Sequence, residues 1–274
     1  MILDVNRRLS LAWCLLIVLT LFISSNLSAV SEKKEKQIFS EAQADFALGL
    51  SQNGEQKRMT MLKAVSRFQV LEKEYGIKNG YLYYNIANAY YEAGEKGKAI
   101  LNYRRGERLV PGFLDLKHNL SQARQDLNLP ESKEIWWTGI VKSVFFWHYM
   151  FDYSTRKTIF FVAFISVWGV MGISIFLKHI FIRTALGLAL FLVVCVGSSY
   201  LYSTYEIYFV RSGVMIEKEC TVRKGPGKNY EKFYEQPLPG GTEFRFIETQ
   251  GDWAKVKLLN REEVWLRADE IELI

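Results

Sequence analysis

The sequence predicts a multi-domain protein of the α plus β class, made of an α-solenoid, a two-helix transmembrane hairpin and a C-terminal β-barrel. Three observations predict this architecture. Apolar residues recur at helical spacing through residues 36–129, two runs of 19 uncharged residues follow at Ile159–Leu177 and Thr184–Tyr202, and short strands with glycine turns fill Val214–Ile274. At 274 residues, the chain can hold several small modules.

The net charge of +6 does not indicate a nucleic-acid surface. Residues 135–205 hold five Lys and Arg against one Asp, so much of the excess lies beside the apolar runs, where cations orient membrane helices. No segment has the concentrated basic stripe that phosphate neutralisation requires. We therefore expect no nucleic acid among the partners.

Residues 1–29 resemble an export signal. Arg7 and Arg8 precede the apolar stretch Leu9–Ile23, and small and polar residues follow as far as Ala29. An uncleaved signal anchor is the alternative. Of the three cysteines, only Cys220 lies in a segment expected outside the membrane, and one thiol cannot form an intrachain disulfide.

Residues 36–129 predict paired helices. Ile38–Leu50 and Met59–Tyr75 form a degenerate first pair, Gly80–Phe113 forms a clear second pair, and Leu114–Leu127 is a candidate cap. The second pair resembles a tetratricopeptide repeat, because small and aromatic residues and a terminating proline fall at that repeat's positions: Tyr83, Ile86, Ala87, Tyr90, Ala99, Tyr103 and Pro111. Gly106 departs from this pattern, since alanine is usual there.

In such a repeat the first helix lines a concave surface that grips other proteins. The residues that this places within reach of a bound peptide are Tyr81, Tyr84, Asn85, Asn88, Tyr91 and Glu92. Asparagine amides can bond both the donors and the acceptors of an extended main chain. The alternative is that these asparagines bond only their own neighbours.

Residues 130–157 are crowded with aromatic side chains and predict an interfacial segment at the headgroup layer, or alternatively a further packing helix of the solenoid. Residues 158–203 predict the transmembrane hairpin, with Lys178–Arg183 as its turn. Neither apolar run carries Asp, Glu, Lys or Arg, so an anchor is expected and a transporter is not. The export signal favours a cytoplasmic turn, with both flanking parts in the periplasm.

Residues 212–274 resemble the bacterial SH3-like domain. The resemblance rests on Val222-Arg223-Lys224-Gly225-Pro226, on a glycine-initiated strand and on Gly251-Asp252-Trp253. Arg223, Trp253 and Trp265 are the candidate groove residues, although both tryptophans also suit internal packing. Arg261-Glu262-Glu263 replaces the usual Asp-Gly turn, which makes the last hairpin the least regular part.

The stretch Leu82–Tyr90, with Lys98-Ala99-Ile100, Tyr103-Arg104-Arg105 and His118-Asn119-Leu120 beyond it, is similar to the BatE family of bacterial Bat (aerotolerance) operons. The order of signal, repeats, membrane hairpin and SH3-like domain is similar too. The resemblance implies a component of the bacterial inner membrane. It also implies partners among BatA, BatB and BatD-type von Willebrand A and membrane proteins, and a MoxR-type ATPase.

The leading functional hypothesis is a membrane-anchored periplasmic scaffold that binds protein partners through its repeats. The alternative is a peptidoglycan-binding or envelope-sensing module that acts through the SH3-like domain. A wall hydrolase is disfavoured, because Cys220 has no histidine in its module and no HExxH, GxSxG or phosphate-cradling loop is present. We expect no enzyme activity, catalytic residue, metal or cofactor.

Overall fold

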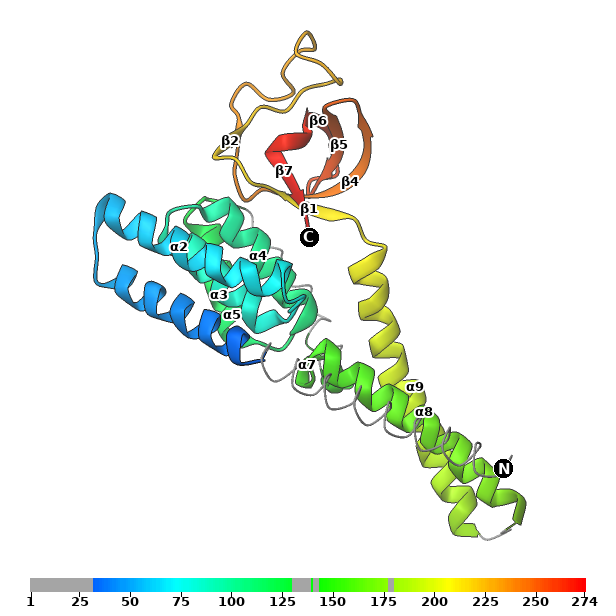
Figure 1. The fold of residues 1–274 in the computed structure, drawn as a ribbon. Coiled ribbons are helices and arrows are strands. Elements are labelled where there is room, and N and C mark those ends of the chain that lie inside the picture. The colour runs from blue at the N-terminus through cyan, green and yellow to red at the C-terminus, as the bar shows by residue number, and fades with distance from the viewer. Residues whose placement is uncertain (1–31, 130–138, 140–142, 177–179) are drawn as a thin grey trace, which may run out of the picture.

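The structure is a computed structural model that describes residues 32–129, 139, 143–176 and 180–274. It combines a helical unit, two long apolar helices and a β unit (Figure 1). The predicted signal at residues 1–29, and Trp136 and Trp137 of the aromatic segment, lie outside the described residues.

The helical unit consists of a helix at residues 32–50, α2 (Gly54–Lys73), α3 (Gly80–Glu92), α4 (Lys96–Leu109) and α5 (Leu114–Gln125). Helices that follow one another from α2 to α5 are in contact. The side chain of Asn79 caps α3 by accepting a hydrogen bond of 2.7 Å from the Leu82 amide. The helix predicted from Met59 begins earlier, at Gly54, so the first connection is short.

Two glycines allow α3 and α4 to approach closely. A Cβ on Gly106 would lie 2.7 Å from Leu116 Cδ1 and 3.0 Å from the carbonyl oxygen of Gly80. A Cβ on Gly80 would lie 3.0 Å from the carbonyl oxygen of Gly106. Gly106, at the position where alanine is usual, therefore allows α3 and α4 to cross more closely than a side chain there would permit.

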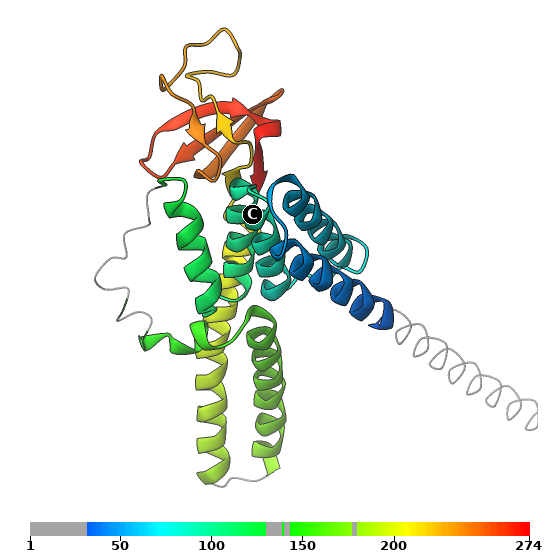
Figure 2. The same cartoon turned by 90° about the vertical axis from the view of Figure 1, so that its left-hand side faces the viewer.

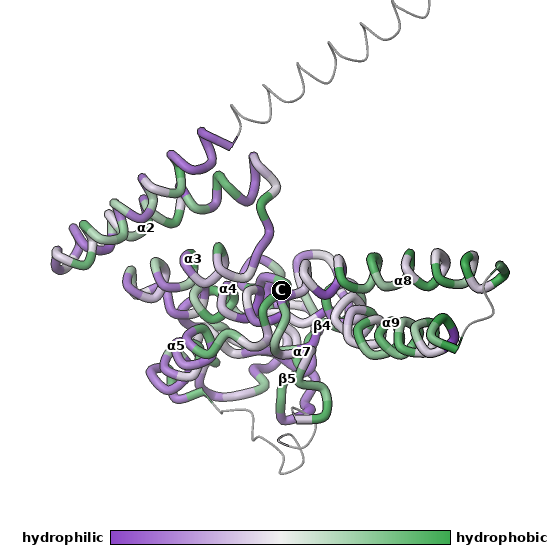
Figure 3. Tube along the Cα trace, turned by 90° about the horizontal axis from the view of Figure 1, so that it is seen from below, coloured by the Kyte–Doolittle hydropathy of each residue, from purple (hydrophilic) through white to green (hydrophobic). Residues whose placement is uncertain are grey.

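After α7 (Phe146–Met150), the helices α8 (Tyr153–Phe176) and α9 (Ile180–Tyr208) run side by side away from the rest of the chain (Figures 1 and 2). Apolar residues cover both helices (Figure 3). Each helix is long and apolar enough to cross a membrane. At about 1.5 Å per residue, α8 is about 36 Å and α9 about 43 Å long, so both exceed a hydrocarbon core of about 30 Å.

The β unit contains a five-stranded antiparallel sheet in the order β6-β5-β4-β1-β7 and a two-stranded sheet of β2 and β3. Buried side chains that alternate along β5, namely Ala254, Val256 and Leu258, face its core. The sequence predicts short strands through Val214–Ile274, and the described residues form seven: β1 (Ser212–Met215), β2 (Glu219–Cys220), β3 (Leu238–Pro239), β4 (Glu243–Gln250), β5 (Trp253–Leu258), β6 (Glu263–Arg267) and β7 (Ile271–Leu273).

The helical and β units are docked against each other, which the sequence did not indicate. Val214 of β1 is fully buried in the cluster formed by α4 and α5. A Cβ on Gly97 of α4 would lie 2.9 Å from the carbonyl oxygen of Met215. Arg108 donates to the carbonyl oxygens of Ile274 (3.0 Å) and Val210 (3.1 Å). The two units therefore share a core and a polar seam.

Candidate functional site

A groove runs along α3, between the helix at residues 32–50 on one side and α5 on the other. It consists of two adjoining hollows of about 290 Å³ and 280 Å³ that share Phe46 and Asn88. We call it the α3 groove. Its lining residues are Gln43, Phe46, Leu50, Phe68, Asn85, Asn88, Tyr91, Glu92, Tyr103, Asn119 and Gln122.

Four of the six predicted peptide-contact residues line this groove: Asn85, Asn88, Tyr91 and Glu92. Tyr81 and Tyr84 do not. Their rings pack on Phe113, with centroid separations of 5.1 Å and 4.9 Å, at the start of α3. They support the α3–α5 contact instead of facing the groove.

The two groove asparagines differ in their bonding. The side-chain oxygen of Asn88 accepts from the Tyr103 hydroxyl (2.5 Å) and from Asn119 Nδ2 (2.9 Å), so it holds three helices together. Burial raises the pKa of Tyr103, which keeps this donor protonated. Within the described residues, the Asn85 amide has no side-chain hydrogen bond and borders the groove. The self-bonding alternative thus fits Asn88 Oδ1, whereas Asn85 remains open to a ligand.

The rim beside α5 is polar and charged. The Tyr91 hydroxyl donates to Asp126 (2.7 Å), and Lys96 pairs with the same carboxylate at 3.1 Å. Hydrogen bonds from Tyr91, Lys96 and Gln122 lower the pKa of Asp126 to about 2. Glu92 pairs with Lys57. Polar groups on both sides of an apolar wall suit an extended peptide, which presents amides and side chains together.

Sequence reasoning missed one wall of the groove. The sequence predicts Ile38–Leu50 only as one helix of a packed pair, yet Leu50 is 53 % exposed and lines the groove together with Phe46. Asn119 and Gln122 of α5 were missed because α5 was considered only as a cap. Exposed apolar residues near the end of a helix were the available signal.

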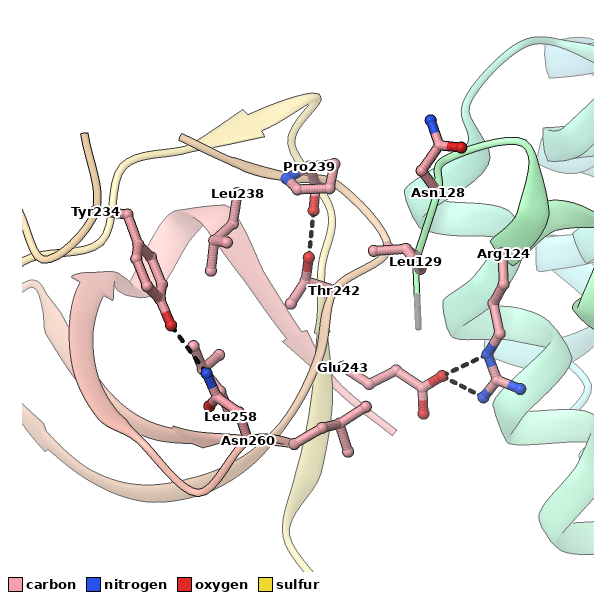
Figure 4. Close-up of a pocket in the computed structure, with 12 residues that line it drawn as sticks. Arg124, Asn128, Leu129, Tyr234, Leu238, Pro239, Thr242, Glu243, Leu258 and Asn260 are labelled. Atoms are coloured by element: carbon pink, nitrogen blue, oxygen red, sulfur yellow. Dashed lines mark hydrogen bonds and ion pairs between the residues drawn. The ribbon is translucent and has the colours of Figure 1, made fainter. Parts of the chain in front are cut away.

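A second cavity of about 280 Å³ lies where α5 meets the β unit (Figure 4). Tyr234 and Asn260 border it, and the Asn260 amide donates to the Tyr234 hydroxyl at 3.0 Å. Arg124 and Glu243 form an ion pair at its helical end (Figure 4).

The predicted SH3-like groove residues lie elsewhere. Arg223 and Trp265 exchange backbone hydrogen bonds of 2.7 Å and 2.9 Å. The β5–β6 register pairs Lys255 with Trp265, which puts Trp253 and Trp265 on the same face of the sheet. Trp265 is only 9 % exposed, so Trp253 offers most of the aromatic surface there.

Within the described ranges, no cluster of three or more His, Cys, Asp or Glu could hold a metal ion. Cys220 is buried in the β core, and burial raises the pKa of its thiol to about 12. A thiol in that state is a poor nucleophile, because the thiolate is the reactive form.

The fold and groove define a mixed helix-and-sheet protein with two helices capable of crossing a membrane and a groove on its helical unit. No protein-family model, curated protein or solved structure matches the chain.

Proposed function

We propose that the protein is a membrane-anchored adaptor whose α3 groove binds an extended segment of a partner protein. The observation that carries the proposal is the groove itself, where Asn85 and Glu92 of α3 line, together with Phe46, two adjoining hollows of about 280 Å³ and 290 Å³. The helical pairs are proposed to be tetratricopeptide repeats, the class of helical hairpins that uses this face for peptides. In this reading α8 and α9 span the inner membrane as a hairpin.

The proposed compartment is the periplasm. The charge-free runs within α8 and α9 support insertion, and the N-terminal signal pattern supports export of the flanking units. The resemblance to BatE adds candidate partners, which are the membrane proteins with von Willebrand A domains of Bat operons.

A photo-crosslinking amino acid placed at Asn85 of the full-length protein, in native membranes, tests the groove. We expect a discrete protein adduct at Asn85, and its loss when Gln122, across the groove, is also changed to Ala. The matched control is the same amino acid at Asn53, which is exposed at the start of α2 without a side-chain cap bond. Adducts of equal yield at both positions, or none at Asn85, would contradict the proposal.

A second candidate function is binding of peptidoglycan through the β unit, which we propose to be an SH3-like barrel. The shared face of Trp253 and Trp265, with Arg223 beside it, supports this role, because aromatic rings and cations bind glycan and peptide groups. Sedimentation of the full-length protein with purified sacculi, with and without Trp253→Ala, distinguishes the two functions. Wall binding requires a pellet that the substitution abolishes.

A further inference from the structure

A cavity of about 400 Å³ lies between α7 and the C-terminal half of α9, below the helical unit. Its lining is mostly aromatic and consists of Phe145, His148, Tyr149, Ser198, Ser199 and Tyr202. A smaller polar cavity of about 200 Å³ shares His148, Tyr149 and Tyr202 with it. The two together form a pocket with an apolar part and a charged part.

Arg156 of α8 is buried directly beside this pocket. Its side chain is fully buried, and its Nη1 donates to His148 Nδ1 at 2.6 Å and to the Ser199 hydroxyl at 3.0 Å, both of which line the larger cavity. The Nη2 atom is buried and has no hydrogen-bond partner in the part of the chain that the structure describes. A buried guanidinium with an unused donor is costly unless an anion completes it.

The hydrogen-bond partners of Arg156 are all neutral. Besides the Ser199 hydroxyl they are the backbone oxygens of Asp152 (3.5 Å) and Ser199 (3.4 Å) and the imidazole of His148. Because Nδ1 of His148 accepts from a guanidinium, that ring carries no positive charge. None of these hydrogen-bond partners therefore carries a negative charge, and the carboxylates of Asp152 and Glu206 act on the Arg156 charge only from a greater distance. The polar cavity is itself lined by three cations, Arg104, Arg108 and Lys117, and by two carboxylates, Glu107 and Glu206, so its lining carries a net positive charge.

The depth of the pocket is that of lipid headgroups, if α8 and α9 cross the membrane as proposed above. Ser199 and Tyr202 lie at the C-terminal end of the uncharged run Thr184–Tyr202. Arg156 precedes the other uncharged run, Ile159–Leu177. This is where about 30 Å of hydrocarbon gives way to phosphates. Aromatic rings such as Tyr149 and Tyr202 are typical of the same layer.

We propose that this pocket binds one anionic phospholipid, with its phosphate beside His148 and Ser199, at the end of the pocket next to Arg156, and an acyl chain along the aromatic wall. A phosphate there places a negative charge next to the buried guanidinium of Arg156, whose hydrogen-bond partners His148 and Ser199 line the cavity. The lining rings of Phe145, Tyr149 and Tyr202 suit an acyl chain, whereas free phosphate would leave them in contact with water. The site rests on the membrane insertion proposed above.

The test uses the purified full-length protein in detergent, with added dioleoyl phosphatidylglycerol or phosphatidylcholine, and native mass spectrometry of the retained lipid. We expect one tightly held phosphatidylglycerol on the wild type and a preference over phosphatidylcholine. Arg156→Gln should weaken retention about tenfold, as expected for the loss of one neighbouring opposite charge. Excess inorganic phosphate should not displace the lipid.

Lys157→Gln is the matched control, because Lys157 is exposed, adjacent in sequence and carries the same charge. It should retain the lipid. Ser198→Phe fills the cavity without changing Arg156, so it should also release the lipid. This variant tests the site if Arg156→Gln does not fold. Equal losses from Arg156→Gln and Lys157→Gln, retention by Ser198→Phe, or displacement by inorganic phosphate would overturn the site.

Alkaline carbonate extraction of the starting membranes separates this proposal from the one on which it rests. A protein released by carbonate contradicts the membrane anchor. A protein that stays in the membrane but holds no phosphatidylglycerol after purification contradicts only the lipid site.

Discussion

Asn85 and Asn88 lie about one helical turn apart on α3, but their side-chain amides differ in their hydrogen bonds. Asn88 Oδ1 is occupied by Tyr103 and Asn119, so replacing it removes an acceptor from two buried or half-buried donors. Asn85 can be replaced with little structural consequence. An experiment on the groove is therefore cleaner at Asn85, where a loss of binding does not report a loss of folding.

Gly106 carries the first prediction at the scale of the residue. In an open helix, Gly106→Ala would stabilise by about 1 kcal/mol. Here the new Cβ would lie 2.7 Å from Leu116 Cδ1, and overpacking of this kind costs about 1 to 3 kcal/mol. We expect a lower midpoint in thermal unfolding followed by circular dichroism. Gly187→Ala in α9, where nothing lies within 4 Å, is the control and should not lower the midpoint. A raised midpoint for Gly106→Ala would refute the tight crossing.

The surroundings of His148 predict that the stability of the protein depends on pH. Burial, followed by the nearby charges of Arg156 and Lys117, lowers the pKa of His148 to about 4. The unfolded chain takes up this proton near pH 6.5, so between pH 6.5 and 4 the unfolded state holds more protons and stability falls as the pH falls. The slope is at most about 1.4 kcal/mol per pH unit, and solvent contact reduces it.

The measurement is the difference in unfolding midpoint between the wild type and His148→Asn across that pH range, with both proteins freed of phospholipid, because a bound phosphate beside His148 would raise the pKa of the ring. Asparagine keeps an acceptor for Arg156 but does not titrate. The wild type should lose stability relative to the variant as the pH falls, since other titrating groups are common to both. Curves that stay parallel from pH 7 to pH 4 would mean that His148 does not titrate as described.

At the scale of the element, α4, α5 and β4 meet around a single carboxylate. Glu243 lies 2.9 Å from Arg104 Nε, too poorly aligned for a hydrogen bond, and accepts from Arg124 Nε at 2.9 Å. Its side chain is 13 % exposed. Removing it leaves two largely buried guanidinium groups without their shared partner.

We expect Glu243→Ala to lower the free energy of unfolding by about 2 kcal/mol, which lies between the values for surface and buried ion pairs. Hydrogen exchange should increase in β1, β4 and α5, because the seam loosens. Glu272→Ala is the control: Glu272 is 47 % exposed, and its partner Arg105 also donates to the Leu273 carbonyl. Equal exchange in both variants would show that Glu243 does not hold the units together.

Most helices could be predicted from the sequence, because each carries its own apolar face and local end signals. The starts of α2 and α8 were less predictable. Helix α2 begins at Gly54, although glycine disfavours a helix, and α8 begins at Tyr153, although the charged Arg156 disfavours a membrane-spanning segment. Half of the groove was predictable from α3 alone. The walls of the groove and the Arg104–Glu243 contact could not be predicted. Both join residues that are far apart in the sequence, and the pattern around one residue does not indicate the other.

At the scale of the whole molecule, the docking of the helical and β units limits how the protein can work. Val214 completes the core of the helical unit, and Arg108 holds the C-terminal strand and Ser212. The α3 groove and the Trp253 face therefore have a fixed relation to each other. A partner bound at one surface is therefore held at a defined distance from a ligand of the other. The β unit lies above α8 and α9, and the helical unit lies beside their upper end (Figure 2).

The same arrangement makes the topology testable with introduced cysteines and a membrane-impermeant maleimide. Met59→Cys probes the helical unit, Lys228→Cys the β unit and Thr184→Cys the far end of the hairpin; all three positions are exposed. In intact cells with a permeabilised outer membrane, the first two should react and the third should react only after lysis, because two spanning helices return the chain to its starting side. The wild type gives the background, with Cys220 buried in the β core. If Thr184→Cys alone reacts in intact cells, the protein is inverted and its groove faces cytoplasmic partners. If only one of the two units reacts, α8 and α9 do not form a spanning hairpin.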